Sequence, residues 1–170
     1  MIIVDDFLDY DSHQLIKESL EYRDFWSFDP YKAGGSSGIQ DGQLFHMFYF
    51  EMERSRHMQV LLPILHKVKP LAVFRIKANL QLHGGEEAYK SNWHYDFTGD
   101  GYPVSDMMTA IYYVNSNNGY TEFNDCKVES VSNRMVFFPS NTKHRGVNAT
   151  NVKARYVINF NYFPMKLDKS

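Results

Sequence analysis

Two potential metal ligands, His94 and Asp96, are separated by one residue in the segment 93–97. In an extended chain residues i and i+2 project to the same side, so both side chains can contact one ion. The best candidate for a third ligand is His144, which follows a predicted strand end and turn. Two imidazoles and one carboxylate on one face of a metal form a facial triad that suits Fe(II) and leaves three positions open. The other five histidines lack ligand spacing and are predicted to be surface or core-edge residues: His13, His46, His57, His66 and His83.

An arginine eleven residues after His144 adds a second chemical function. Arg155 lies in a segment of alternating polarity, and a hairpin-like return of the chain would direct its side chain into the cavity of the metal ligands. A guanidinium can hold a carboxylate through two parallel hydrogen bonds, which a lysine cannot match geometrically. The pattern therefore predicts a carboxylate ligand beside the metal. The simpler alternative is a solvated arginine on an edge strand.

Strands must position these residues, because the hydrophobic pattern changes from a helical period to a period of two at Leu71. Residues 72–83 alternate between apolar and polar side chains, which predicts a strand with two distinct faces. Residues 107–115 are apolar on both faces and predict a central strand. Two further strands are expected at residues 134–138 and 154–163, separated by turns rich in Gly and Asn.

The N-terminal part is predicted to be mainly helical. After a short strand at residues 2–7, Asp11 and Gln14 resemble a capping box that opens a helix to about Glu21. Residues 24–43 are predicted to form a long surface loop, and apolar residues between 58 and 65 follow helical spacing that Pro63 must kink or restart. Helices that precede strands favour an α+β or barrel arrangement in which the helices buttress one sheet.

The composition of the 170 residues fits one globular domain, since 44% of the side chains are hydrophobic and 22% are charged. No apolar run is long enough to span a membrane, and the N-terminus becomes acidic too early for a signal peptide. The single cysteine, Cys126, favours a reducing compartment, and we expect a cytoplasmic protein. The net charge of −2 hides an asymmetry: 11 acidic and 3 basic side chains up to Glu53, but 9 acidic and 15 basic after it.

The stretch from about Leu71 to Phe163 resembles the Fe(II)- and 2-oxoglutarate-dependent dioxygenases, specifically the prolyl-4-hydroxylase-like branch and its small phage-encoded members. The resemblance implies a double-stranded β-helix, or jelly roll, over residues 71–163, with helical support from residues 1–70 in one domain of residues 1–170. It rests on motifs in a fixed order: His94-Tyr95-Asp96, Ala110–Asn115, Asn118–Thr121, Arg134–Ser140, His144 and Arg155–Phe160.

The resemblance also implies roles for individual side chains. The iron ligands would be His94, Asp96 and His144. Arg155 would pair with the distal carboxylate of 2-oxoglutarate, Tyr113 would help to hold that carboxylate, and Thr121 would line the same pocket. For phage-encoded members, the compartment would be the host cytoplasm.

The implied reaction uses Fe(II), 2-oxoglutarate and O2, with ascorbate as a possible reductant, and releases succinate and CO2. A C–H bond of a polypeptide side chain, with proline preferred, would be hydroxylated. Two departures weaken the prolyl assignment: Asn79-Leu80 stands where many prolyl hydroxylases carry a tyrosine, and Asn118-Gly119 replaces a glycine pair. Asn79 is a further candidate contact to the cosubstrate.

Two other functions remain open at this point. One is oxidative demethylation of nucleic acid, which the basic balance after Arg54 favours, although the second arginine of that branch is absent after Arg155. The other is a non-enzymatic, cupin-like metal-binding barrel, although such barrels usually carry H-x-H and a glutamate. Three segments could form a lid over the site: residues 24–43, 84–91 and 98–101.

Overall fold

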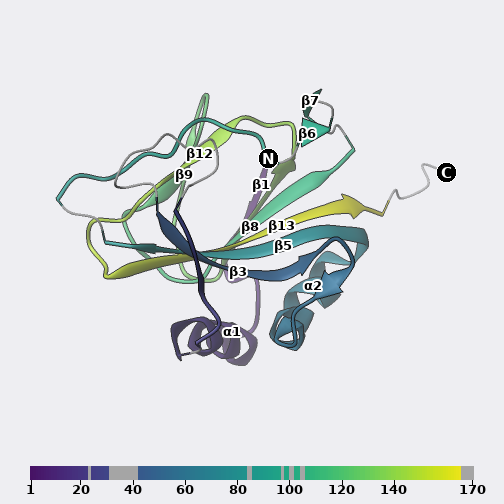
Figure 1. Cartoon of the computed structure of the whole chain (residues 1–170). Helices are drawn as coiled ribbons and strands as arrows, with labels where there is room; N and C mark the ends of the chain where they lie inside the picture. The colour runs from purple at the N-terminus through teal and green to yellow at the C-terminus, as the bar shows by residue number, and fades with distance from the viewer. Residues whose placement is uncertain are drawn as a thin grey trace.

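The computed structural model describes residues 1–22, 24–30, 42–83, 86–96, 98–99, 102–103 and 106–165. Most of its strands belong to one antiparallel sheet with the order β1-β11-β8-β13-β5-β3-β2, and β4 pairs with β3 at its margin (Figure 1). The strand bounds in this sheet are β1 Ile2–Val4, β2 Ser27–Asp29, β3 Gln43–Phe50, β4 Glu53–Arg54, β5 Pro70–Leu82, β8 Met108–Tyr113, β11 Arg134–Pro139 and β13 Ala154–Pro164.

A smaller antiparallel sheet faces the large one. It has the order β10-β9-β12 and consists of β9 Tyr120–Phe123, β10 Lys127–Glu129 and β12 His144–Val147. A separate pair joins β6 Thr98–Gly99 to β7 Tyr102–Pro103. The two facing sheets are those of the expected double-stranded β-helix.

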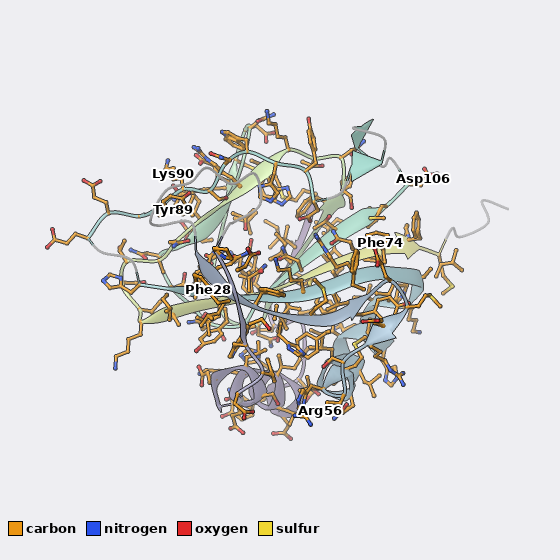
Figure 2. All side chains as sticks on the ribbon, viewed as in Figure 1. Phe28, Arg56, Phe74, Tyr89, Lys90 and Asp106 are labelled. Atoms are coloured by element: carbon orange, nitrogen blue, oxygen red, sulfur yellow. The ribbon has the colours of Figure 1, made fainter. Side chains whose placement is uncertain are left out.

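The helices cover the outer face of the large sheet. Helix α1 spans Tyr10–Tyr22, and the 3₁₀ helix η1 (Met58–Leu61) leads into α2 (Leu62–Val68) (Figure 1). Their apolar side chains form one core with the outward-facing residues of the sheet strands, and Figure 2 shows side chains filling this layer. The expectation of helices that buttress one sheet is therefore confirmed.

Alternation along β8 separates two cores. Ala110 and Tyr112 face the helices, whereas Ile111 and Tyr113 face the small sheet. Both sets are buried, which explains why the segment is apolar on its two faces. The central strand was predicted correctly, as were the strands β11 and β13.

Several local predictions need correction. The cap of α1 is Asp9, whose carboxylate accepts a hydrogen bond from the Ser12 backbone N–H at 2.9 Å, and Asp11 lies inside the first turn. The predicted strand at residues 2–7 ends at Val4, because Asp6 has a positive φ of 48° that turns the chain. The restart near Pro63 is confirmed, since η1 ends at Leu61 and α2 begins at Leu62 with Pro63 in its first turn.

The segment 24–43 is not one long loop. It contains β2 and the first residue of β3, and β3 as a whole was not predicted. Residues 31–41, 84–85, 97 and 100–101, which belong to the proposed lid segments or adjoin them, lie outside the described residues. Within the described part of the chain, no helix has both the length and the apolar character needed to cross a membrane.

Candidate metal centre and its cavity

The structure brings the three predicted metal ligands together. The backbones of His94 and His144 exchange two hydrogen bonds, of 2.9 and 3.0 Å. In such a directly paired antiparallel bridge the two side chains project side by side from the same face. The Asp96 Oδ1 atom is 3.8 Å from His144 Nε2, and one ligand atom of each residue lies within 4.8 Å of the others. Ligands about 2.0–2.2 Å from one metal ion are separated by about 3–4 Å, so small side-chain adjustments suffice for all three to bind one ion.

Both imidazoles are oriented in the same way. The Nδ1 of His94 meets the carbonyl of Asn92 at 2.9 Å, and the Nδ1 of His144 meets the carbonyl of Thr142 at 3.0 Å. Because a carbonyl only accepts, each Nδ1 must carry the proton, which leaves the Nε2 lone pairs free for a metal. Burial, aided by the neighbouring His144, lowers the pKa of His94 and favours the neutral form that binds metals.

Asp96 is ionised despite its burial. Its side chain is 3% exposed. Burial alone would raise the pKa of Asp96, but the His144 imidazole and the Arg75 guanidinium outweigh it, so the pKa lies below its usual value. A metal entering the cluster therefore meets a charged carboxylate and two imidazoles, the donor set that suits Fe(II).

A polar cavity extends from this cluster over the inner face of β5 and β13, between the large sheet and the small sheet. Arg155 of β13 pairs with Gln81 of β5 in the sheet register, and both residues line the cavity. Asn79 and Asn159 also line it, and each has a buried Oδ1 atom without a hydrogen-bond partner among the described residues. A buried oxygen without a partner is costly, which is typical of a cavity built for a guest.

The arginine at the end of this cavity has no counter-anion in the described part of the chain. Arg155 is 2% exposed, and its guanidinium donates to the Ser130 hydroxyl at 2.9 Å and to Gln81 Oε1 at 3.0 Å. Both partners are neutral, and no carboxylate of the described residues forms an ion pair with it. A buried, uncompensated charge is expensive, so the cavity fits an anionic guest such as a carboxylate. The alternative of a solvated edge-strand arginine is wrong.

The remaining two predicted site residues contact each other beside Arg155. The Tyr113 hydroxyl donates to Thr121 Oγ1 at 2.8 Å, and the Tyr113 ring centre is 5.8 Å from Arg155 Cζ. Thr121 lines the cavity. Gly119 makes room for the arginine, because a Cβ atom there would lie 2.8 Å from Arg155 Cδ and 2.8 Å from the Val147 carbonyl oxygen.

We expect Tyr113→Phe to weaken 2-oxo acid binding modestly. The substitution removes the hydroxyl that donates to the cavity-lining Thr121, and a neutral hydrogen bond contributes about 0.5–1.5 kcal/mol, or about 2- to 10-fold in affinity. Calorimetric titration with 2-oxoglutarate in the presence of Mn²⁺ measures this change. Tyr112→Phe is the matched control, because the Tyr112 hydroxyl contacts His13 and Asn133 on the helix side of the sheet. An equal loss of affinity in both variants would contradict the assignment.

Sequence reasoning missed several polar side chains at this site. Arg75, Lys77 and Gln81 stand on the polar face of β5 and line the cavity, although no role at the site was predicted for them. Asn161 on β13 donates a hydrogen bond to Asp96 Oδ2 at 3.1 Å. The sequence did contain a signal of this polar cavity, because β5 and β13 both place amide and cationic side chains on one face.

Comparisons with known proteins give a family and a fold. A family model described as the 2OG-Fe(II) oxygenase superfamily matches residues 78–163, half of the chain. A search of curated proteins finds no match.

Among solved structures, a prolyl hydroxylase from Trichoplax adhaerens, in complex with a peptide fragment, has a TM-score of 0.67 and 16% identity over 96% of this chain and 83% of its own. A viral collagen prolyl hydroxylase from Paramecium Bursaria Chlorella virus-1 has a TM-score of 0.62 and 14% identity, over 97% and 96% of the two chains. The epimerase SnoN from nogalamycin biosynthesis has a TM-score of 0.64 and 15% identity, over 96% and 78%. At these identities the neighbours show a common fold.

Proposed function

Because this chain belongs to the 2OG-Fe(II) oxygenase superfamily, we propose that it hydroxylates a C–H bond of a polypeptide side chain, with peptidyl proline as the preferred substrate. The protein is thus an Fe(II)- and 2-oxoglutarate-dependent oxygenase, and the non-enzymatic cupin-like alternative is dropped. In this proposal His94, Asp96 and His144 hold the iron, and Arg155 holds the distal carboxylate of 2-oxoglutarate. The observation that carries it is the three-ligand cluster in a cavity that also contains a buried arginine with no carboxylate partner among the described residues.

Bound iron and 2-oxoglutarate supply the oxidation, in which O2 converts 2-oxoglutarate to succinate and CO2 and places one oxygen atom on the substrate. The residues of this chain bind, orient and shelter the reactants. Carbonyl groups two residues before each histidine hold the imidazoles in place. Ile111 and Val157 supply apolar wall, which reduces the access of water to the reacting groups.

Two observations support a polypeptide substrate. The resemblance of the chain is to the prolyl-hydroxylase-like branch, and one neighbour of similar fold was solved in complex with a peptide.

The substrate class is tested by measuring succinate formation. We expect proline-rich peptides to raise turnover above the uncoupled background, to gain one oxygen atom, and to depend little on salt, because peptide contacts release few counterions. Asp96→Ala serves as the inactive control. If instead a methylated oligonucleotide stimulates turnover and its affinity falls steeply as the salt concentration rises, the substrate is a nucleic acid and the peptide assignment is wrong. The oxidative chemistry proposed here would be unchanged by that result.

We also propose a cytoplasmic setting, the host cytoplasm for a phage-encoded protein. Cys126 is the single cysteine of the chain and is exposed, which is typical of proteins kept in a reducing compartment. Partial burial and the neighbouring Asp125 raise the pKa of the Cys126 thiol. The protonated thiol is a weak nucleophile, which agrees with a cysteine that has no part in the reaction.

A further inference from the structure

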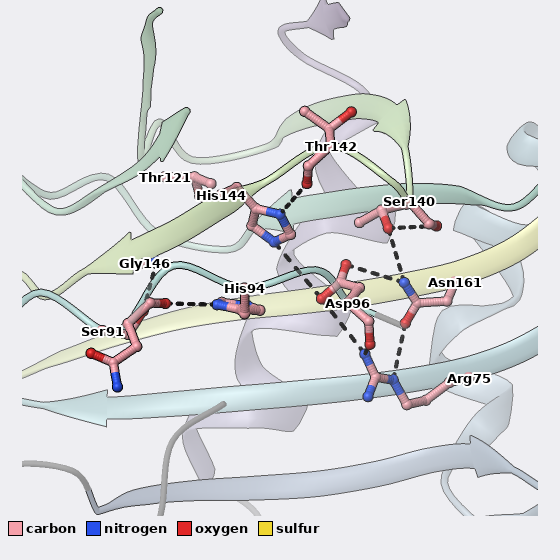
Figure 3. A network of polar contacts seen from close by, with 12 residues as sticks. Arg75, Ser91, His94, Asp96, Thr121, Ser140, Thr142, His144, Gly146 and Asn161 are labelled. Carbon is pink, nitrogen blue, oxygen red and sulfur yellow. Dashed lines mark hydrogen bonds and ion pairs between the residues drawn. The ribbon is translucent and has the colours of Figure 1, made fainter. Parts of the chain in front are cut away.

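A chain of hydrogen bonds holds the metal-ligand carboxylate from behind (Figure 3). Asn161 Nδ2 donates to Asp96 Oδ2 at 3.1 Å and to Thr109 Oγ1 at 3.0 Å. Thr109 Oγ1 in turn lies 2.9 Å from the Ser140 hydroxyl. Arg75 Nε donates to Asn161 Oδ1 at 2.9 Å, and Arg75 Nη2 is 3.6 Å from Asp96 Oδ1. We call Arg75, Asn161, Thr109 and Ser140 the Asp96 clamp.

The clamp determines which way the amide of Asn161 points. A guanidinium can only donate hydrogen bonds, so the atom facing Arg75 Nε must be the amide oxygen. The amide nitrogen then faces Asp96 and Thr109, where it can donate to both. Rotating the amide by 180° would place N–H groups against Arg75 and an oxygen against the Asp96 carboxylate, so the hydrogen bonds to both of these residues would be lost.

The clamp is part of the interior. Asn161, Thr109 and Ser140 are 0% exposed, and the sheet register pairs Asn161 directly with Thr109. Arg75 is the one member with access to solvent, with 22% of its side chain exposed. Buried polar side chains that are fully paired are stiff, so the clamp can transmit the position of the sheet to the carboxylate.

We propose that Asn161 is a positioning residue for the metal, acting through Asp96, with Arg75 setting the orientation of its amide; the inference rests on the metal site of the proposed function. By donating to Oδ2, Asn161 leaves Oδ1 as the oxygen that faces His144, and Arg75 Nη2 approaches that same Oδ1 only to 3.6 Å. A carboxylate that binds through one oxygen occupies one coordination position, whereas a chelating carboxylate would occupy two. The clamp thereby preserves the three open positions that a chelating 2-oxo acid and O2 require together.

The test titrates the metal-free protein with Co²⁺ and follows its visible absorption, which reports affinity and coordination number without turnover. Asn161→Leu keeps the volume but removes the donor, and we expect a 10- to 100-fold loss of Co²⁺ affinity together with altered absorption bands. Arg75→Lys, at a more exposed position, keeps the charge but cannot serve both partners, and a smaller loss with the same spectral change is expected. If Asn161→Leu fails to fold, the Co²⁺ titration of Arg75→Lys still tests the clamp.

Tyr112→Phe controls for a general loss of stability, because it removes buried hydrogen bonds on the other face of the sheet. Co²⁺ affinity within twofold of wild type and an unchanged spectrum in both clamp variants, with binding lost in Asp96→Ala, would overturn the clamp alone. Wild-type protein that binds no Co²⁺ would overturn the metal site and the clamp together.

Discussion

Replacing Asp96 and His144 together with alanine is expected to abolish stoichiometric binding of a divalent metal ion and all 2-oxoglutarate turnover above background. The double variant removes the charged ligand and the imidazole that lies 3.8 Å from it, so only His94 remains of the cluster. One imidazole cannot retain a divalent ion against water and buffer. Metal content after loading with Mn²⁺ or Co²⁺, measured by elemental analysis, checks this outcome directly.

Thermal unfolding provides an independent measurement of the same site. A ligand present at 100 times its dissociation constant stabilises the folded state by about 2.7 kcal/mol. In a chain of this size that increase in the free energy of unfolding raises Tm by roughly 5–10 °C. We expect the rise in wild type and in His66→Ala, whose histidine lies on α2 away from the cluster, and no rise in the double variant. Stoichiometric metal retained by the double variant would refute the ligand assignment.

Arg155→Ala is expected to leave the metal site intact and to weaken 2-oxoglutarate binding by about 30-fold to several thousand-fold. Truncating one partner of a buried charge pair costs about 2–5 kcal/mol, and the described residues offer no second cation at the Gln81 end of the cavity. Titration of the Mn²⁺-loaded protein with 2-oxoglutarate gives the affinity, and metal content confirms the intact centre. Unchanged affinity would contradict the role assigned to Arg155.

Two further variants separate charge from geometry at this position. Arg155→Lys keeps a cation but loses the two-pronged hydrogen bonding, so we expect an affinity between those of wild type and Arg155→Ala. Arg155→Met replaces a buried guanidinium that has no counter-anion among the described residues by an apolar side chain of similar length. We expect Arg155→Met to unfold, without 2-oxoglutarate, at a temperature no lower than wild type, because the cost of the buried charge is relieved. A large fall in Tm would show that Arg155 has a structural function.

Helices and most of the long strands were predictable from local periodicity, although the eight-residue β3 was missed. The spacing of Met58, Leu61 and Leu65 located η1 and α2, and alternation located β5 and β13. Short strands were missed, because β9, β10 and β12 contain three or four residues each and carry too little pattern to be recognised. The β12 strand matters most, since its first residue is His144.

By itself, the sequence determined the chemistry available at the site. The His94-x-Asp96 spacing, the later His144 and the alternating position of Arg155 follow from residue types and from the period of an extended chain. The family resemblance added the expected jelly roll and the roles of Tyr113 and Thr121. These features depend on residues close in sequence, or on motif order, so one chain suffices to find them.

Tertiary structure alone decided which polar residues are buried around that chemistry. A period of two shows that Arg75, Asn79 and Gln81 share a face, but the same alternation describes a solvated face and a cavity wall equally well. Only the facing small sheet, formed by β9, β10 and β12, turns that face inward. The contact of Asn161 with Asp96 joins residues 65 positions apart, and such a pairing depends on how two strands and a loop pack in space.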